Sequence, residues 1–311
     1  MSYQNIPGIS DKFERDCEER WDMIQPELPA AGVVVDIGAA EGYFVKQIAE
    51  QTDLLAVGIE KQKGRVLFQR RWLTEEHLGK VVSCHCNFGE AMAGAVAATP
   101  EWFDVTLILS TLHWINSDEF LRHIASMSGK VIVEIPDLAD RSATGQKFMA
   151  RLRKYGSEQE YFEHVTGRTV RLLGTVAAHT YPVRKLWVIE GDMIRRTHTP
   201  HIDYGKATGV TYFQRFKGGQ LLYVKRHKVI DWIPGINMAT LRAMGVTWPS
   251  AEWWLEKVRA AKDELDMSKV AGDLRIHNMI VSRGKLSWID LDHHPHRTTI
   301  FEDTKDMVKN I

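Results

Sequence analysis

The chain has 311 residues, of which 44% are hydrophobic, and 40 basic residues are balanced by 40 acidic ones. This length allows two domains with ordinary cores, and a net charge of zero excludes an overall field that attracts nucleic acid. No signal peptide is evident after Met1, and no apolar run reaches the roughly 20 residues that span a bilayer. We therefore expect a cytoplasmic protein, with peripheral association at the inner membrane face as an alternative.

Predicted strands and helices alternate along residues 11–190, as in a doubly wound α/β sheet. Apolar periodicity predicts helices at residues 11–23, 43–50, 65–73 and 145–155. It predicts strands at residues 33–37, 54–59, 81–85, 104–109, 130–135, 170–173 and 186–190. The polar segment 191–209 breaks this pattern and is the natural domain boundary.

A glycine-containing turn joins the first of these strands to the next helix. The stretch reads Val-Val-Val-Asp-Ile-Gly-Ala-Ala-Glu-Gly-Tyr-Phe, from Val33 to Phe44. Gly38 and Gly42 remove side chains where the backbone bends and approaches a ligand, and the helix that follows offers free N–H groups to a carboxylate or phosphate. Glu60, just after the second strand, suits the two hydroxyls of a ribose.

The spacing of this turn resembles motif I of class I S-adenosylmethionine (SAM) methyltransferases, and differs from the Gly-x-Gly-x-x-Gly turn of nicotinamide enzymes. The resemblance implies a seven-stranded Rossmann-like sheet and SAM as the cofactor. It implies that Asp36 helps to order the turn and that Glu60 binds the ribose. The amino-acid end of SAM would then lie against the turn residues Gly38, Ala39, Ala40 and Gly42.

Further cofactor-binding residues are expected where the later strands end, because ligands of open sheets bind at the carboxyl ends of strands. Phe88 is expected to lie against the adenine, with Asn87 or Glu90 as a polar contact. The predicted set after strands two to four is Lys61, Arg65, Asn87, Phe88, Glu90 and Leu109.

Three other segments resemble the bifunctional methyltransferase/kinase family that terminates O-antigen polymannose chains. They are Tyr3-Gln4, the Arg-Asp-Cys-x-x-Arg run that ends at Arg20, and the Leu-Ser-x-x-His-x-Ile run that starts at Leu109. The resemblance covers residues 3–190. It implies that Tyr3, Gln4 and Arg20 contact the cofactor, that Arg20 binds its carboxylate, and that Tyr3 is also catalytic. By their residue types alone, Arg20 is equally well a solvated helix residue and Tyr3 a frayed terminus.

Ser110 and His113 follow the fourth strand, where a methyl acceptor must approach. An unperturbed histidine titrates near neutrality, so His113 is a candidate general base for a sugar hydroxyl. A packed histidine is the structural alternative. If the acceptor is an ionised phosphate, positioning suffices and no base is needed.

A second group of residues near the C-terminus resembles the catalytic loop and metal-binding strand of kinase-like phosphotransferases. The resemblance implies that Asp273 orients a hydroxyl, that Asn278 and Asp290 hold Mg²⁺, and that Lys225, in a hairpin, pairs with the phosphates of ATP. Only 47 residues separate Lys225 from Asp273. That is too short for a glutamate helix, a nucleotide hinge and a lower lobe, so we expect an inactive or acceptor-binding module.

Together these patterns predict a SAM-dependent methyltransferase domain at residues 1–195 and a smaller, shortened α+β kinase-like module at residues 210–311. The predicted reaction is methyl transfer to a glycan or glycan-phosphate acceptor of the O-antigen or lipopolysaccharide type, with ATP and Mg²⁺ as conditional ligands of the module. Three alternatives are an active bifunctional methyltransferase/kinase, an RNA methyltransferase and a non-catalytic SAM-binding regulatory protein. Ser110 at the position of an expected Asp, and the zero net charge, disfavour the RNA enzyme.

Overall fold

The structure is a computed structural model, and each statement below concerns the residues that it describes. These are residues 2–10, 12–87, 103–138, 146–177, 183–191, 210–217, 220–228, 235–265, 273–282, 284–288, 297–309 and 311. Three predicted site residues, Phe88, Glu90 and Asp290, lie outside these ranges.

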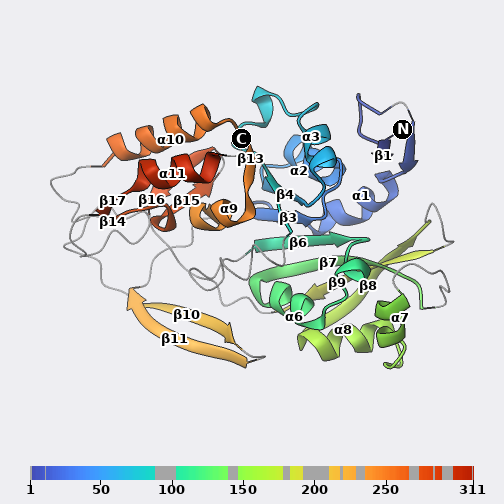
Figure 1. The fold of residues 1–311 in the computed structure, drawn as a ribbon. Coiled ribbons are helices and arrows are strands. Elements are labelled where there is room, and N and C mark those ends of the chain that lie inside the picture. Colours follow the sequence, from blue (N-terminus) through green and yellow to red (C-terminus); the bar gives the residue numbers. More distant parts are fainter. Residues whose placement is uncertain are drawn as a thin grey trace.

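An eight-stranded sheet with the order β13-β5-β4-β3-β6-β7-β9-β8 forms the centre of the fold (Figure 1). Strands β5, β4, β3, β6 and β7 are parallel, and β9 runs antiparallel to both β7 and β8. The predicted seven-stranded, doubly wound sheet is therefore confirmed, and β13 extends it by one antiparallel strand. The strands are β3 Val33–Ile37, β4 Leu55–Glu60, β5 Val81–His85, β6 Phe103–Leu109, β7 Ser128–Pro136, β8 Thr169–Val176, β9 Arg184–Glu190 and β13 Val246–Trp248.

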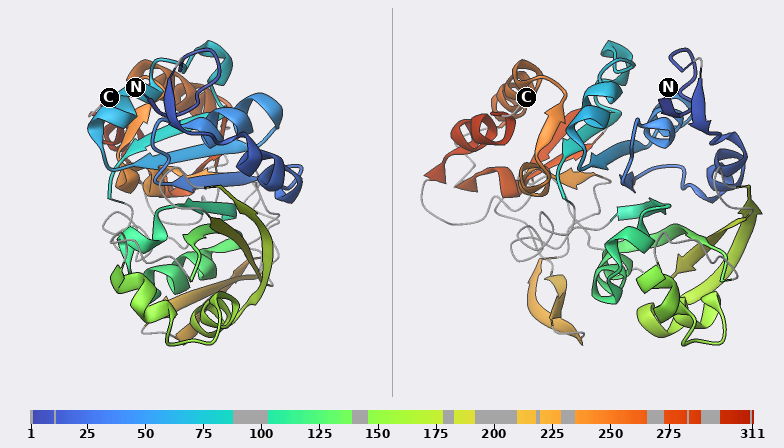
Figure 2. Two further views of the ribbon diagram at one scale, coloured as in Figure 1. Left: turned by 90° about the vertical axis from the view of Figure 1, so that its right-hand side faces the viewer. Right: turned by 45° about the vertical axis from the view of Figure 1, so that its right-hand side comes forward.

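Helices cover both faces of this sheet, which explains why every residue of β3 is buried (Figures 1 and 2). Because side chains alternate along a strand, Val33 and Val35 join one apolar core and Val34 joins the other. The core around Val34 includes α1 (Glu18–Ile24) and α2 (Tyr43–Gln51), with α3 (Lys63–Gln69) beside them. The opposite core includes α6 (Asp118–Met127), α7 (Gln146–Leu152) and α8 (Glu158–Thr166).

The helix predicted at residues 11–23 is wrong in its first half. Residues Phe13–Arg15 form strand β2, which pairs in parallel with β1 (Ser2–Gln4), and α1 begins only at Glu18. Asn5 fixes this arrangement, because its side chain accepts the N–H of Cys17 at 2.9 Å and donates to Asp16 at 3.0 Å. A contact between separate segments thus overrides the helical periodicity of the sequence.

Two helices of the sheet region, α6 and α8, were not predicted. Each begins after a serine whose hydroxyl accepts a backbone N–H, Ser117 from Phe120 and Ser157 from Glu160. Serine N-caps are a sequence signal that could have located both helices. Shorter elements are the helix α5 (Leu112–Ile115) and the 3-10 turns Gln25–Glu27 and Glu75–His77.

The C-terminal part contains the predicted hairpin, formed by β10 (Val210–Lys217) and β11 (Gln220–Lys228). A three-stranded sheet of β12 (Ile236–Asn237), β15 (Met279–Ser282) and β16 (Lys285–Trp288) follows. β14 (Asp273–Leu274) pairs with β17 (Arg297–Thr298), and Ile276–Asn278 is a 3-10 turn. The helices are α9 (Met238–Met244), α10 (Ala251–Asp263) and α11 (Ile300–Val308). Trp288 donates its indole N–H to the Ala261 carbonyl at 2.8 Å and so ties β16 to α10.

This C-terminal part is continuous with the central sheet. Strand β13 pairs with β5, and Thr247 donates its hydroxyl proton to the Ser83 carbonyl at 2.9 Å. Leu241 of α9 belongs to the same apolar core as Val82 and Cys84 of β5. The boundary between residues 195 and 210 stays a prediction, but the two predicted domains share a sheet edge and a core.

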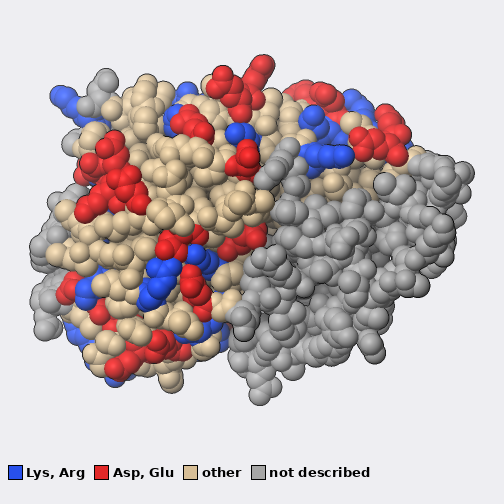
Figure 3. Space-filling model, turned by 180° about the vertical axis from the view of Figure 1, so that it is seen from behind, with Lys and Arg blue, Asp and Glu red and all other residues tan. Residues whose placement is uncertain are grey.

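Acidic and basic side chains are interspersed over the described surface seen from behind (Figure 3). This mixture agrees with the balanced charge of the sequence. Among the described helices, none is both long and apolar enough to cross a bilayer.

Candidate functional site

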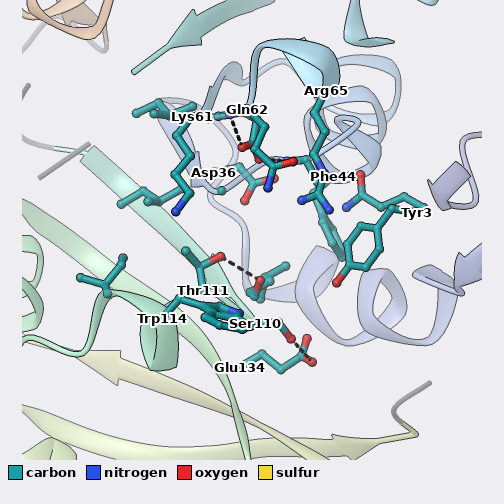
Figure 4. Close-up of a pocket in the computed structure, with 18 of the residues that line it drawn as sticks. Tyr3, Asp36, Phe44, Lys61, Gln62, Arg65, Ser110, Thr111, Trp114 and Glu134 are labelled. Atoms are coloured by element: carbon teal, nitrogen blue, oxygen red, sulfur yellow. Dashed lines mark hydrogen bonds between the residues drawn. The ribbon is translucent and has the colours of Figure 1, made fainter. Parts of the chain in front are cut away.

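A pocket of about 910 Å³ lies at the carboxyl ends of β3, β4 and β6 (Figure 4). The strand order of the sheet reverses between β3 and β6, which is where ligands of open α/β sheets bind. The pocket brings together twelve of the predicted site residues: Tyr3, Gln4, Arg20, Asp36, Gly38, Ala40, Glu60, Lys61, Arg65, Asn87, Leu109 and His113.

Two predicted turn residues, Ala39 and Gly42, do not line this pocket. Ala39 is buried in the apolar core beside α2. A Cβ atom at Gly42 would lie 2.7 Å from the Trp72 ring, so this glycine permits close packing of the turn against Trp72 rather than access of a ligand. The contact of both residues with the cofactor stays a prediction.

The predicted nucleotide site of the C-terminal part stays a prediction. Lys225 lies on β11 and Asp273 on β14, but the described structure does not include their side chains, and Asp290 lies outside it. Asn278 is buried in the turn before β15. Among the described side chains, no group of three or more His, Cys, Asp or Glu could hold a metal ion.

Gly38 brings the turn close to the end of β6. It has a φ of +83°, and a Cβ atom there would lie only 2.5 Å from the Thr111 hydroxyl oxygen. The N–H groups of Gly38 and Ala39 donate to the Ile59 carbonyl at 2.8 and 3.0 Å. Ala40 also has a positive φ, of +52°. A residue without a side chain at position 38 is therefore required by both the backbone angle and the available space.

Glu60 closes the turn from the end of β4. One carboxylate oxygen accepts the N–H of Ala40 at 3.0 Å, and the other accepts the N–H of Gln62 at 2.7 Å. Glu60 is only 4% exposed. Each oxygen keeps a lone pair for a ligand hydroxyl. The turn that Asp36 was expected to order is thus held by Ile59 and Glu60.

Asp36 also lines the pocket and is buried. One of its carboxyl oxygens, Oδ2, has no hydrogen-bond partner among the described residues. Burial, and next the nearby Glu60 carboxylate, raise the pKa of Asp36 to about 7, against the opposing effect of Arg15. A buried carboxyl oxygen without a donor is costly, so it marks a place where a ligand donor fits.

The N-terminus of α2 is capped by a residue of β1. The side-chain oxygen of Gln4 accepts the N–H groups of Glu41 and Tyr43, both at 3.1 Å, and Glu41 accepts the N–H of Gln4 at 2.9 Å. The prediction that this helix start offers free N–H groups to a carboxylate is therefore wrong for these two amides.

Two arginines and a glutamate that line the pocket form a buried ion-pair cluster. Glu134, at the end of β7, is paired with Arg15 and accepts the Arg20 Nε–H at 2.9 Å. Burial alone would raise the pKa of Glu134, but the two arginine charges hold it at about 2. Arg20 also donates to the carbonyls of Asp16 and Ala177. The predicted contact of Arg20 with a cofactor carboxylate stays a prediction, and Glu134 is its partner here.

Ser110 links this cluster to the end of β6. Its hydroxyl donates to Glu134 at 2.8 Å, and its φ of +57° is rare for a residue with a side chain (Figure 4). His113, on α5, is 4% exposed and lines the pocket, with its ring centre 5.3 Å from that of Trp114. Trp114 is 66% exposed although it lines the same pocket. An exposed indole at a pocket is a surface on which a ligand can pack.

Tyr3 and Arg65 form another part of the wall. The Arg65 guanidinium lies 4.7 Å from the centre of the Tyr3 ring, a cation–π contact, and Arg15 donates to the Tyr3 hydroxyl at 3.4 Å (Figure 4). The N-terminal segment thus contributes directly to the pocket, as the sequence resemblance implies.

Sequence reasoning missed several residues that line the pocket. Glu134 directly precedes the end of the fifth predicted strand, so the rule that ligands bind at carboxyl ends of strands could have found it. Nothing in the spacing of the sequence indicates the other members. Among the missed residues are Arg15, Phe44, Trp114, Glu134 and Arg184.

No family model and no curated protein matches this sequence. Among solved structures, the chain is similar to the bifunctional kinase-methyltransferase WbdD, with 17% identity over 93% of this chain and 79% of that chain, and a TM-score of 0.48. It is also similar to a precorrin-6y C5,15-methyltransferase from Geobacter metallireducens (13% identity, 59% of this chain, 93% of that chain, TM-score 0.41). A third similar structure is magnesium protoporphyrin IX methyltransferase from Synechocystis PCC 6803 (14% identity, 56% of this chain, 81% of that chain, TM-score 0.40).

All three TM-scores lie below 0.5, so we assign the fold from the strand order of the sheet and not from these similarities. Five parallel strands with the order β5-β4-β3-β6-β7, followed by antiparallel β9 and then β8, form the observed sheet. The motif I resemblance implies a seven-stranded Rossmann-like sheet, and these seven strands agree with it. The chain has a mostly parallel, Rossmann-like α/β fold.

Proposed function

We propose that this chain is a SAM-dependent methyltransferase. One arrangement carries the proposal. A glycine turn at Gly38, the Glu60 carboxylate bound to Ala40 of that turn, and the Oδ2 atom of Asp36 all line one pocket, and this Oδ2 has no hydrogen-bond partner among the described residues. The residues fit the cofactor, because Glu60 suits ribose hydroxyls and Asp36 suits a positively charged donor. The absence of a side chain at Gly38 lets the cofactor approach the backbone.

When bound, SAM supplies a methyl group on a positively charged sulfur. The chain's own residues have separate tasks in the reaction. Glu60 holds the ribose. The Ser110 hydroxyl donates its hydrogen bond to Glu134. His113 takes the proton of the acceptor hydroxyl at a ring nitrogen as the methyl–oxygen bond forms. Glu134 does not serve as the base, because two arginine charges hold its pKa at about 2.

The proposed acceptor is a glycan or a glycan phosphate. The pocket is lined by five basic residues (Arg15, Arg20, Lys61, Arg65 and Arg184) and three acidic ones (Asp36, Glu60 and Glu134), whereas the whole chain is balanced at 40 and 40. This local excess of positive charge supports an anionic acceptor. The exposed Trp114 ring supports a sugar, which has an apolar ring face and a polar edge. The Leu-Ser-x-x-His-x-Ile resemblance supports the same class.

A methyl-transfer assay tests this proposal. Isotope-labelled SAM is offered with mannotriose, phosphorylated mannotriose or transfer RNA, and labelled products are identified by mass spectrometry. We expect label in a saccharide, loss of label with Glu60→Ala, and an unchanged rate with Glu252→Ala, at an exposed position on α10. Label in the RNA alone would contradict the acceptor, and no labelled product from any acceptor would contradict the proposed activity. Adding ATP and Mg²⁺ to the same assay should yield no phosphorylated saccharide.

A further inference from the structure

Asp36 differs from the other acidic residues of the pocket in its surroundings. It is 2% exposed, and its Oδ2 atom has no hydrogen-bond partner among the described residues. Its neighbours across the sheet are Gly58 on β4 and Leu107 on β6, and neither carries a polar side chain. In contrast, both oxygens of Glu60 accept backbone N–H groups, and both oxygens of Glu134 accept arginine hydrogen bonds.

Charged groups from several elements face Asp36. Glu60 on β4 disfavours its ionised form, and Arg15 on β2 favours it, although Arg15 is already paired with Glu134. His113 on α5, Lys61 after β4 and Arg65 on α3 line the same pocket. Burial and the like charge of Glu60 outweigh Arg15, so the Asp36 carboxyl group is partly protonated at neutral pH.

We propose that Asp36 gives up its proton when SAM binds and thereby makes the pocket selective for the positively charged methyl donor. This inference rests on the proposed function. SAM carries a sulfonium and an ammonium against one carboxylate, whereas the product S-adenosylhomocysteine has lost the sulfonium charge. An added positive charge favours ionised Asp36, and its proton goes to the solvent. After methyl transfer that stabilisation is reduced, so Asp36 regains a proton and the product is held less tightly than the donor.

The proposal predicts how many protons are released at each pH. With a pKa of about 7 in the empty pocket, full ionisation on binding releases about 0.9 proton at pH 6, about 0.5 at pH 7 and about 0.1 at pH 8. By linkage, SAM affinity rises with pH by up to about tenfold per unit below pH 7 and levels off above it. The affinity for S-adenosylhomocysteine rises less, so the preference for SAM over this product increases with pH.

Isothermal titration calorimetry measures both quantities without a methyl acceptor. SAM and S-adenosylhomocysteine are each titrated into the full chain at pH 6, 7 and 8, in two buffers of different ionisation enthalpy. In the wild type we expect the binding enthalpy to differ between the two buffers. The difference should equal the proton count above multiplied by the difference between the ionisation enthalpies of the buffers. Asp36→Asn should abolish the difference and flatten the pH dependence of the donor-to-product affinity ratio. The control His164→Asn, at an exposed titratable residue of α8 that does not line the pocket, should retain both.

A second variant keeps the test decisive if Asp36→Asn does not fold. Glu60→Gln removes the like charge that faces Asp36, so proton release at pH 7 should fall even where SAM affinity also falls. SAM binding with equal heats in both buffers would overturn this inference and leave the proposed function standing. Release that persists in Asp36→Asn, or a ratio that does not change with pH, would also overturn it. A wild type that binds no SAM would overturn the proposed function and this inference together.

Discussion

The side-chain oxygen of Gln4 lies 3.1 Å from the backbone nitrogen of Tyr43, the first residue of α2, and accepts its hydrogen bond. The same oxygen accepts the N–H of Glu41 at 3.1 Å. These two hydrogen bonds connect the N-terminal strand β1 to the end of the glycine turn. The pocket therefore depends on a segment that is far from the sheet in sequence.

Replacing Gln4 tests how much this cap contributes. Gln4→Ala leaves two buried N–H groups without their acceptor, so we expect the free energy of unfolding to fall by about 1–2 kcal/mol. Urea denaturation measures the change. Gln25→Ala, at an exposed position after α1, should alter stability by less than about 0.5 kcal/mol. Equal stability of the two variants would contradict the capping role.

Ser110 should show the cost of its backbone conformation. Ser110→Ala and Ser110→Gly both remove the hydrogen bond to Glu134, but only glycine adopts the φ of +57° without strain. We therefore expect the glycine variant to be more stable by about 1 kcal/mol in urea denaturation. The same pair of substitutions at Ser126, inside α6, should give the reverse order by about the same amount. A Ser110→Ala variant that is more stable than Ser110→Gly would refute the backbone strain at position 110.

The Glu134 cluster predicts an acid-sensitive contribution to stability. The pKa of Glu134 is about 2 in the folded protein, because Arg15 and Arg20 overcome the effect of burial, and about 4.3 in an unfolded chain. The unfolded state thus binds the proton more tightly, and the stabilisation is complete above pH 5 and is lost as pH falls from 4 toward 2. This one group gives a slope of at most about 1.4 kcal/mol per pH unit.

Urea denaturation between pH 3 and 6 measures that slope. Glu134→Gln should lower stability at pH 6 and should flatten the dependence, because the group that titrates is gone. Glu256→Gln, at an exposed position on α10, should keep the wild-type slope. A slope unchanged by Glu134→Gln would assign the acid sensitivity to other carboxyl groups.

His113 as the general base predicts a loss of turnover without a loss of cofactor binding. His113→Asn should lower the methyl-transfer rate by about 10²–10⁴-fold and leave the Kd for SAM nearly unchanged. His164→Asn, on the exposed side of α8, should retain the wild-type rate. A wild-type rate for His113→Asn would mean that His113 is a packing residue and that the acceptor arrives already ionised.

The sequence predicted the parts of the pocket that depend on local signals. The strand β3, the turn at Gly38 and the position of Glu60 at the end of β4 all follow from apolar runs and glycine spacing, and the structure contains them. Arg20 illustrates what local signals miss. Its partner Glu134 is 114 residues away, so no spacing pattern joins the two. The same holds for β13, whose Val246 pairs with Cys84 of β5.

The N-terminal segment shows a second limit. The apolar periodicity of residues 11–23 is genuine for α1, but pairing of β1 with β2 and the two hydrogen bonds of Asn5 decide the conformation before Glu18. Local periodicity cannot reveal a competing long-range contact. This pairing also places Arg15 in the pocket, which explains why sequence reasoning missed that residue.

The binding of SAM to Gly38→Ala tests the central claim most directly. Gly38 and Gly8 have similar positive φ values, +83° and +77°, but a Cβ atom at Gly38 would contact Thr111 at the pocket, whereas none lies within 4 Å at Gly8. In calorimetry at pH 8 we expect one SAM per wild-type chain, at least about tenfold weaker binding by Gly38→Ala, and wild-type affinity for Gly8→Ala. A wild type that binds no SAM, or a Gly38→Ala variant with unchanged affinity, would contradict the assignment of this pocket to the cofactor.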